Sequence, residues 1–296
     1  MGAKTIEPTN SELRDSSAAD APRDGAPRLD ARREAAAEEV APGPPKSLLR
    51  EYFESAVVTI IMALFGMTFI VQAVKVPTGS MQNTINIGDQ LLVNKFVFAP
   101  GPDVPFLPTR EIRRGDVVVF KYPGNPHDTT GRDLKPDNIP FRTNYVKRVV
   151  GLPGETVEVR GDTVFINGEP LPERRATVAS ASVGEDPALQ VLNDPAPEGT
   201  GPYTVYHDVS DPEAGDAHYA LEGEPTPIPE GHYFVMGDNH DNSADRRVWG
   251  FVPRELIVGR ATMVYWSYDL SDTSGGNPIA KFFRNSRWSR TGTMIR

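Results

Sequence analysis

The sequence of 296 residues contains no cysteine. Without thiols the chain can form no disulfide, no thiolate zinc site and no cysteine nucleophile, although this absence does not exclude a location outside the cytoplasm. Its five histidines show no HExxH spacing, so zinc-dependent hydrolysis is not expected. We therefore expect neither a metal nor a cofactor. The five are His127, His207, His218, His232 and His240.

Positive charge is in deficit, because 31 lysines and arginines face 40 aspartates and glutamates, for a net charge of -9. Contacts to nucleic-acid phosphates require a cationic surface. We therefore expect no nucleic-acid partner.

Aromatic residues are missing from the start of the chain, where Tyr52 is the first. The preceding stretch consists largely of Ala, Pro, Glu, Asp and Arg. Such a composition cannot bury enough apolar surface to offset the entropy lost on ordering. We predict a disordered tail over residues 1–50, on the cytoplasmic side of a membrane.

A long apolar run follows that tail. Ser55 to Val74 is a stretch of 20 residues without charge, and at 1.5 Å per residue a helix of this length spans roughly 30 Å of hydrocarbon. A cleaved signal peptide fits less well, because the run begins deep in the chain and lacks an A-x-A exit. A buried core helix is the other alternative. Lys46 and Arg50 before the run, against Lys75 after it, favour an inside N-terminus. We predict a single transmembrane signal-anchor helix over residues 51–75.

Beyond the run the pattern changes to short strands rich in Val, Phe and Tyr. Val157 to Leu171 alternates apolar and polar residues around two hairpin signals, Gly161-Asp162 and Asn167-Gly168. We predict a mostly β ectodomain with a β core at 76–171 and 231–272. Between these parts, residues 172–230 hold nine prolines and 12 acidic against two basic side chains, which indicates a loop-rich acidic insertion. Residues 273–296 form a basic C-terminal tail.

Ser80 lies in PTGSMQNTI, a few residues after the apolar run. Gly79 permits unusual backbone angles, so a tight turn can hold the Ser80 hydroxyl. A turn serine is by itself ordinary, and a nucleophilic serine needs a base within hydrogen-bonding reach. His240 with Asp238 or Asp241 is one source of that base.

Lys147, in TNYVKRVVGLPGE, is the other candidate base. On a strand its side chain shares a face with Tyr145 and Val149, and Arg148 points to the other face. Burial disfavours the charged form of the amine, so it would lower the pKa of Lys147 toward neutral pH. A strand-edge lysine that reaches water is the alternative.

A polar loop, MGDNHDNSADRRVWGFVP, follows a third apolar strand. Its spacing lacks the glycine and the terminal glutamate of an EF-hand, so calcium is not expected. Asp245 and Arg247 can pair across a turn, and Ser243 can orient a nearby amine.

Read together, these segments resemble type I signal peptidases, membrane-anchored serine proteases that remove signal peptides from exported proteins. Five motifs occur in the family order: the apolar run, VPTGSMQNTINIGDQLLVNKF, RRGDVVVFKYP, NYVKRVVGLPGETVEV and GDNHDNSADRRVWGFVPRELIVGRA. They cover about Val76 to Tyr122, Asn144 to Gly168 and Phe234 to Tyr268. The tail and the acidic insertion lie outside them.

The resemblance implies that Ser80 is the nucleophile and Lys147 the general base of a Ser-Lys dyad, with an acyl-enzyme intermediate. Ser243 then orients the Lys147 amine. Thr78, where the family more often has serine, joins the Ser80 backbone N–H in the oxyanion hole.

The resemblance also assigns residues around the dyad. Four charged residues support the site, and four side chains line shallow pockets for small residues of A-x-A type cleavage sites. The implied partners are preprotein signal peptides, membrane lipid and, indirectly, the export machinery. The implied location is the cell membrane, with the catalytic domain on the outer face. The supporting residues are Asp238, Asp245, Arg247 and Arg148, and the pocket residues are Val76, Met81, Tyr145 and Val146.

Two departures from the family pattern stand out. Asn83 takes the place of a proline in Ser-Met-x-Pro-Thr-Leu; asparagine tolerates turn angles, so we expect the loop to persist. Arg246 precedes Arg247 where many members have serine.

Two alternative functions are open on the sequence, and so is the role of the C-terminal segment. A self-cleaving repressor of the SOS type resembles the same Ser-Lys core but carries a DNA-binding head. A membrane-tethered β-domain binding module would keep the scaffold without activity. For Ile279 to Arg296, with five basic and three aromatic side chains, contact with anionic lipid and a packed C-terminus are both possible.

Overall fold

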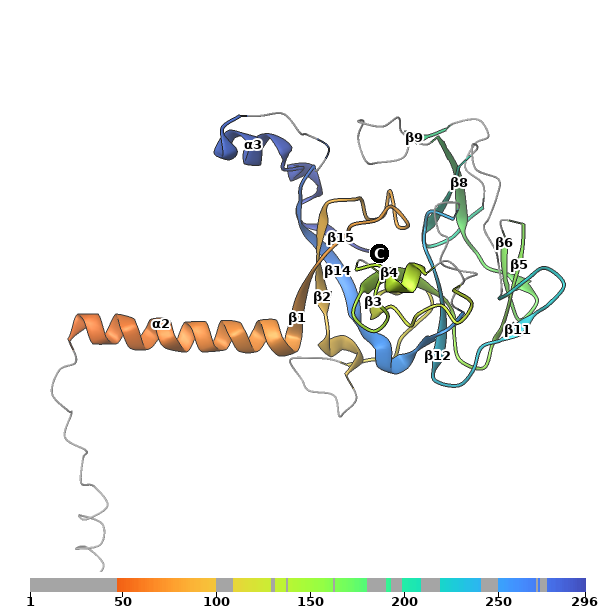
Figure 1. The fold of residues 1–296 in the computed structure, drawn as a ribbon, viewed down its shortest axis with the longest axis horizontal. Coiled ribbons are helices and arrows are strands. Elements are labelled where there is room, and N and C mark those ends of the chain that lie inside the picture. Colours follow the sequence, from red (N-terminus) through yellow and green to blue (C-terminus); the bar gives the residue numbers. More distant parts are fainter. Residues whose placement is uncertain are drawn as a thin grey trace, which may run out of the picture. The chain divides into compact units, whose positions relative to one another are not determined.

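The fold is organised around one antiparallel sheet, seen in the computed structural model in Figure 1. The structure describes residues 47–99, 109–128, 131–136, 138–161, 163–179, 190–192, 199–208, 219–240, 250–269, 271 and 276–296. The chain divides into two units, residues 1–56 and 57–296. Of the first unit, only residues 47–56 are described, so the predicted tail lies almost wholly outside the described residues.

The apolar run forms helix α2, Leu48–Phe65, continued by a π-helical turn, η2, Gly66–Ile70. Arg50 and Glu54, one turn apart in α2, form an ion pair at 2.8 Å. The anchor predicted over residues 51–75 therefore needs correcting at its end, because Val71–Lys75 is strand β1. These five residues leave the helix because β2 supplies their backbone partners, from Asn94 to Gln90. In the described part of the chain, no helix has the length and apolar character needed to cross a membrane.

The main sheet has the strand order β1-β2-β14-β3-β4-β12-β13, and β15 pairs with β14. Every neighbouring pair is antiparallel. The sheet confirms the mostly β fold predicted from the Val-rich and aromatic segments. Its strands are β1, β2 (Asp89–Asn94), β3 (Val117–Lys121), β4 (Asn144–Gly151), β12 (His232–Met236), β13 (Val252–Pro253), β14 (Ile257–Ser267) and β15 (Thr293–Met294).

Two smaller sheets complete the strand structure. One has the order β11-β5-β6-β7, and its β6–β7 turn places Asn167 at φ 52° and Gly168 at φ 84°, the left-handed pair that the Asn-Gly signal predicts. The other has the order β10-β8-β9, and both β8 and β10 come from the acidic insertion. The strands are β5 (Thr156–Arg160), β6 (Thr163–Ile166), β7 (Glu169–Pro170), β8 (Arg174–Ala179), β9 (Gln190–Val191), β10 (Thr204–Asp208) and β11 (Thr226–Pro227).

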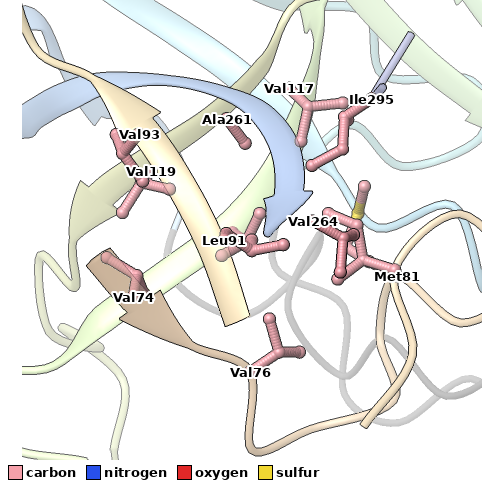
Figure 2. Packing of buried hydrophobic residues seen from close by; sticks show 12 residues of the cluster. Val74, Val76, Met81, Leu91, Val93, Val117, Val119, Ala261, Val264 and Ile295 are labelled. Atoms are coloured by element: carbon pink, nitrogen blue, oxygen red, sulfur yellow. The ribbon is translucent and has the colours of Figure 1, made fainter. Parts of the chain in front are cut away.

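Three clusters of buried apolar side chains form the core. The first joins β1, β2, β3 and β14 to the loop after β1; Figure 2 shows Val76 and Met81 of that loop beside Leu91 and Val264. The loop that carries Ser80 is therefore packed against the sheet by its own apolar residues.

The C-terminal segment packs onto the sheet. Strand β15 pairs with β14, and Ile295 is 4% exposed within the first cluster. The remaining helices are short: α3 (Pro278–Asn285), η3 (Phe96–Phe98), η4 (Arg132–Leu134), η5 (Arg254–Leu256) and η6 (Trp288–Arg290). Of the two possibilities left open for this segment, packing is what the structure shows for residues 293–295.

Gly259 provides a test of the sheet. Strand β14 shifts register at this residue, and a Cβ there would lie 2.3 Å from the backbone oxygen of Asn94, which cannot swing aside. We expect Gly259→Ala to lower the free energy of unfolding by about 1–3 kcal/mol, measured by chemical denaturation. The matched control is Gly66→Ala, where a Cβ would meet nothing within 4 Å. Equal stability of the two variants would contradict this packing.

Candidate active site

Ser80 lies in the loop that joins β1 to β2. The loop is closed at its base by hydrogen bonds from the Val76 amide to the Asp89 carbonyl, at 3.0 Å, and from the Gly88 amide to the Val76 carbonyl, at 3.1 Å. Within it, the Gln82 amide donates to the Gly79 carbonyl at 2.9 Å, which makes the tight turn around Ser80. The serine is 8% exposed. The predicted tight turn is therefore present.

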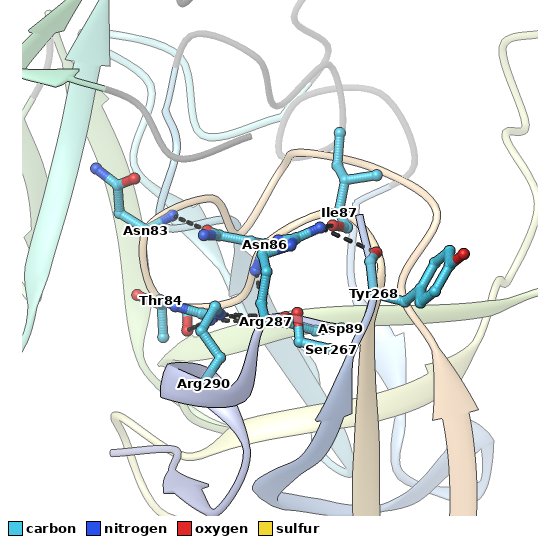
Figure 3. A network of polar contacts seen from close by, with 9 residues as sticks. All are labelled: Asn83, Thr84, Asn86, Ile87, Asp89, Ser267, Tyr268, Arg287 and Arg290. Carbon is cyan, nitrogen blue, oxygen red and sulfur yellow. Dashed lines mark hydrogen bonds and ion pairs between the residues drawn. The ribbon is translucent and has the colours of Figure 1, made fainter. Parts of the chain in front are cut away.

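The far side of this loop is held by a buried carboxylate, Asp89, shown in Figure 3. Asp89 accepts hydrogen bonds from the Ser267 hydroxyl at 2.6 Å, from the Asn86 amide at 2.9 Å and from the Arg290 guanidinium at 2.6 Å. Arg290 also donates to the Thr84 carbonyl at 3.2 Å. The segment after Ser80 is thus fastened to the C-terminal part of the chain.

Asn83, which replaces the family proline, has a φ of 71°. Its amide donates to the Asn86 side-chain oxygen at 2.9 Å. Asparagine is among the few non-glycine residues that tolerate this left-handed conformation. Proline fixes φ near -65° and has no N–H, so it fits neither the angle nor the hydrogen bond. The missing proline therefore suits the turn that this loop adopts.

Lys147 is on β4, opposite Val118 of β3, and is 1% exposed. Burial lowers the pKa of Lys147 to about 7, and the negative charge of Asp238 acts in the opposite direction. At that pKa roughly half of the amines are neutral at pH 7. The strand-edge alternative, in which the amine reaches water, is wrong.

Asp238 and Asn239, just past the end of β12, join the Ser80 turn to β4. The Asp238 carboxylate forms a buried, two-pronged ion pair with Arg148, at 2.6 and 2.7 Å, and accepts the Thr84 hydroxyl at 2.6 Å. The Asn239 amide donates to the Ser80 carbonyl at 3.1 Å. Arg148 and Asp238 are thus paired with each other, and residues 238–239 are bonded to the loop of Ser80.

The Ser80 turn has two further contacts with the same segment. The Asn239 side chain donates to the Gly79 carbonyl at 3.3 Å, and the Asp238 amide donates to the Met81 sulfur at 3.4 Å. The residues on both sides of the serine are therefore bonded to residues 238–239. The turn cannot move without breaking these bonds.

The remaining predicted site residues lie in different surroundings. Val76, Met81 and Val146 are buried in one cluster, the first. Tyr145 instead packs against the second cluster, with its ring 4.9 Å from that of Tyr122, so the structure does not bring all four pocket residues together. Thr78 is exposed. Three further predicted site residues, Ser243, Asp245 and Arg247, lie outside the described residues.

Sequence reasoning missed Thr84, Asn239, Asp89 and Arg290. Thr84 and Asn239 are inside the quoted motifs, and polar residues beside a proposed nucleophile are a usable signal. Asp89 and Arg290 are 201 positions apart, so no local pattern connects them.

The His-Asp alternative for the base involves His240 with Asp238 or Asp241, and Asp241 lies outside the described residues. His240 is 1% exposed and its ring lies 4.8 Å from that of His207, whereas Asp238 is bound by Arg148 and Thr84. Among the described residues, no group of three or more metal-binding side chains comes together. A serine on a tight turn and a buried lysine that is half neutral at pH 7 are elements of serine hydrolase chemistry.

Comparison with known proteins agrees with this class. The family described as "Signal peptidase, peptidase S26" matches residues 49–266. The chain is 35% identical to "Signal peptidase I" of Pseudomonas aeruginosa over 271 residues, covering 83% of this chain and 80% of that one. It is 34% identical to "Signal peptidase I" of Pseudomonas fluorescens over 235 residues, with 75% and 74% covered. A third relative, "Signal peptidase I" of Leptolyngbya laminosa, is 31% identical over 220 residues, with 74% and 81% covered.

The chain therefore belongs to the signal peptidase family, peptidase S26. It is an enzyme of the signal peptidase I type, a serine peptidase and thus a hydrolase. This assignment rules out the two alternative functions that were open on the sequence, a self-cleaving repressor and an inactive binding module.

Asn83 gives a test of the loop. We expect Asn83→Pro to lower the free energy of unfolding by about 3 kcal/mol or more, because proline fits neither the φ of 71° nor the bond to Asn86. Asn83→Gly, which accepts the left-handed conformation, is the control and should stay within about 1 kcal/mol of the wild type. Thermal and chemical denaturation measure both. A proline variant as stable as the glycine variant would show that the loop takes another conformation.

Proposed function

We propose that the protein is a membrane-bound serine endopeptidase that cleaves N-terminal signal peptides from exported preproteins, with Ser80 as nucleophile and neutral Lys147 as general base. The observation that carries the proposal is the buried Lys147, whose pKa is lowered to about 7. A base with a pKa near the working pH combines a useful neutral fraction with enough basicity to accept a proton. Ser80 contributes a hydroxyl on a turn that is bonded to residues 238–239.

The reaction needs no other base. The Lys147 Nζ takes the proton of the Ser80 hydroxyl as Oγ bonds to the carbonyl carbon of the scissile peptide. The resulting ammonium gives that proton to the leaving amine when the C–N bond breaks, which leaves an ester on Ser80. A water then loses a proton to Lys147 and attacks the ester carbon. Collapse of this second intermediate returns the proton to Oγ and releases the signal peptide.

The negative oxygen of each intermediate needs hydrogen-bond donors. We assign this role to the Ser80 backbone N–H and to the Thr78 hydroxyl. Thr78 is exposed and is two residues from the nucleophile, so its hydroxyl is accessible to a bound peptide. Ser243, in the family position that orients the lysine, is part of the proposal. Asp245 and Arg247 are proposed as a supporting ion pair.

We assign the preference for small residues to a shallow pocket beside Ser80. Val76, Met81 and Val146 belong to the same apolar cluster, and Val76 and Met81 flank Ser80 in the loop. A floor made of such side chains favours alanine-sized residues, as in an A-x-A site, and excludes larger ones by overlap. The Tyr145 ring, which packs beside Phe120 and Tyr122, would border the pocket only from the other cluster.

The proposed location is the cell membrane, crossed once, with the N-terminus in the cytoplasm and the catalytic domain outside. Support comes from the apolar side chains exposed along α2 and η2, which a lipid environment would cover. They include Val58, Ile60, Ile61, Met62, Leu64, Phe65 and Met67. Preproteins being exported are the substrates, so contact with the export machinery is indirect.

Helix α3 provides a second surface for lipid contact. Ile279, Phe283 and Trp288, at the helix and just beyond it, are 69%, 59% and 53% exposed. Lys281 and Arg284 on the same helix supply positive charge for anionic headgroups. We propose that this face rests on the membrane surface.

The dyad is tested by substitution. We expect Ser80→Ala and Lys147→Ala each to lower cleavage of a signal-bearing precursor by about 10³-fold or more, because one removes the nucleophile and the other its base. Ser271→Ala and Lys135→Ala change an exposed serine and an exposed lysine and should cleave as the wild type does. Purified proteins in detergent, with folding checked by circular dichroism, give the comparison. Near wild-type cleavage by folded Lys147→Ala would refute the dyad.

The pH dependence tests the base separately. Only the neutral amine accepts a proton, so kcat/KM should rise about tenfold per pH unit below a midpoint near 7 and level off above it. The assay uses a slowly cleaved peptide, for which chemistry limits the rate. A flat profile between about pH 6 and pH 9 would rule out Lys147 as the titrating base, even if Ser80 proved essential.

A further inference from the structure

The acidic insertion contacts the proposed active site through its backbone. The Tyr206 amide, on β10, donates to the Asp238 carbonyl at 2.8 Å, and the His240 amide donates to the Tyr206 carbonyl at 2.9 Å. Tyr206 and Asn239 form a parallel bridge. Residues 238–240 thus have strand-like support from a segment that lies outside the family motifs.

A side chain of the insertion also meets the site. The ring of Tyr203 lies against the Arg148 guanidinium, whose central carbon is 4.2 Å from the ring centroid. This is cation–π geometry, and it is strongest where water is excluded, as it is here, because Arg148 is 2% exposed. The Tyr203 hydroxyl donates to Glu173 at 3.1 Å, and Glu173 is 6% exposed.

The backbone that carries Tyr203 is held in place by β8 and the residues before it. The Arg174 amide donates to the Tyr203 carbonyl at 3.1 Å, and β10 continues in parallel with β8 from Thr204 opposite Arg174. The approach is close, because a Cβ at Gly201 would lie 2.4 Å from the Pro172 carbonyl oxygen. The insertion therefore presents the ring to Arg148 from a rigid base.

The contact matters because of the charges around Asp238. Arg148 neutralises the Asp238 carboxylate, which is the charge that opposes the lowering of the Lys147 pKa. A guanidinium that moved away would leave Asp238 free to stabilise the Lys147 ammonium. The other titratable groups that act here are Glu173, Tyr203 and Tyr206; burial raises the pKa of each, and the charge of Asp238 adds to this in each case.

We propose that Tyr203 and Glu173 are positioning residues of the active site: they fix Arg148 against Asp238, and in this way keep the Lys147 amine neutral and aligned. The proposal rests on the proposed function of Lys147 as the base. It makes the insertion a working part of the enzyme.

Burial of Glu173 is consistent with such a fixed position. Desolvation raises the pKa of Glu173 to about 7, and the Asp238 charge adds to this, whereas Tyr203, Arg175 and Arg148 act against it. Glu173 plays no part in the proposed chemistry, and one of its carboxyl oxygens accepts the hydrogen bond from the Tyr203 hydroxyl.

The test compares Tyr203→Leu, which removes ring and hydroxyl, with Tyr203→Phe, which keeps the ring against Arg148. We expect Tyr203→Leu to lower kcat by about 10- to 100-fold with KM for the peptide unchanged, because the substrate contacts are untouched. The midpoint of its pH profile should move up by about one pH unit, since a less neutralised Asp238 favours the ammonium. Tyr203→Phe should restore the midpoint and stay within about threefold of the wild-type kcat.

The role of Glu173, the partner of the Tyr203 hydroxyl, can be tested with a matched control. Glu173→Leu removes the partner of the Tyr203 hydroxyl and should lower kcat in the same direction as Tyr203→Leu, by about fivefold. Glu224→Leu makes the same change at an exposed glutamate of the insertion and should leave kcat unchanged. If Tyr203→Leu does not fold, Glu173→Leu decides the question. A folded variant with only a lower melting temperature, and with wild-type kcat and pH midpoint, would overturn the proposal.

A measurement independent of cleavage separates the two proposals. Carbon-13 labelling of the lysine Cε atoms reports the ionisation of Lys147 directly, with its signal identified by its loss in Lys147→Met. We expect its titration midpoint to rise by about one pH unit in Tyr203→Leu and not in Tyr203→Phe. This result in an enzyme that failed to cleave precursors would sustain the positioning role while refuting the proposed function. An unshifted midpoint in an enzyme that still cleaves precursors would refute the positioning role and leave the proposed function intact.

Discussion

The arrangement depends on one buried carboxylate, Asp238. Its charge is compensated by Arg148 at 2.6 Å and by the Thr84 hydroxyl at 2.6 Å, and its backbone carbonyl accepts the Tyr206 amide. These partners come from β4, from the loop of Ser80 and from the acidic insertion. Losing one member of such a buried pair typically costs 3–5 kcal/mol, because the other charge is left without compensation. Three parts of the chain that are distant in sequence are thus held together by one residue.

Much of the fold could be predicted because its strands carry local signals. The sequence predicts short strands rich in Val, Phe and Tyr beyond the apolar run, and the segments of this kind around Leu91, Val119, Val149, Val235 and Val264 are all strands of the main sheet. Asn167 and Gly168 formed the turn that their types favour. The end of the apolar helix was wrong, since Val71–Lys75 are apolar enough to continue it and only the pairing with β2 makes them a strand. Pairing is a tertiary fact, which a hydropathy pattern does not contain.

For the candidate site, the residues inside motifs could be predicted, whereas the contacts between distant segments could not. Ser80, Lys147, Arg148 and Asp238 lie within compact motifs, and burial of the Lys147 amine follows from its place on an alternating strand. The contact of Tyr203 with Arg148 joins a proline-rich stretch to a motif and leaves no pattern in either. Such contacts become visible only when the strands have been placed, because each depends on the register of β8 and β10.

The bond between Asp89 and Arg290 has a consequence for the order in which the enzyme is assembled. The residues are 201 positions apart, so the contact closes a long loop and forms late compared with the hairpin of β1 and β2. As the chain emerges from the ribosome, Ser80 appears long before the arginine that fastens its loop. Until Arg290 has been synthesised and has bound to Asp89, the loop of the proposed nucleophile lacks this fastening, so its geometry cannot be complete before then.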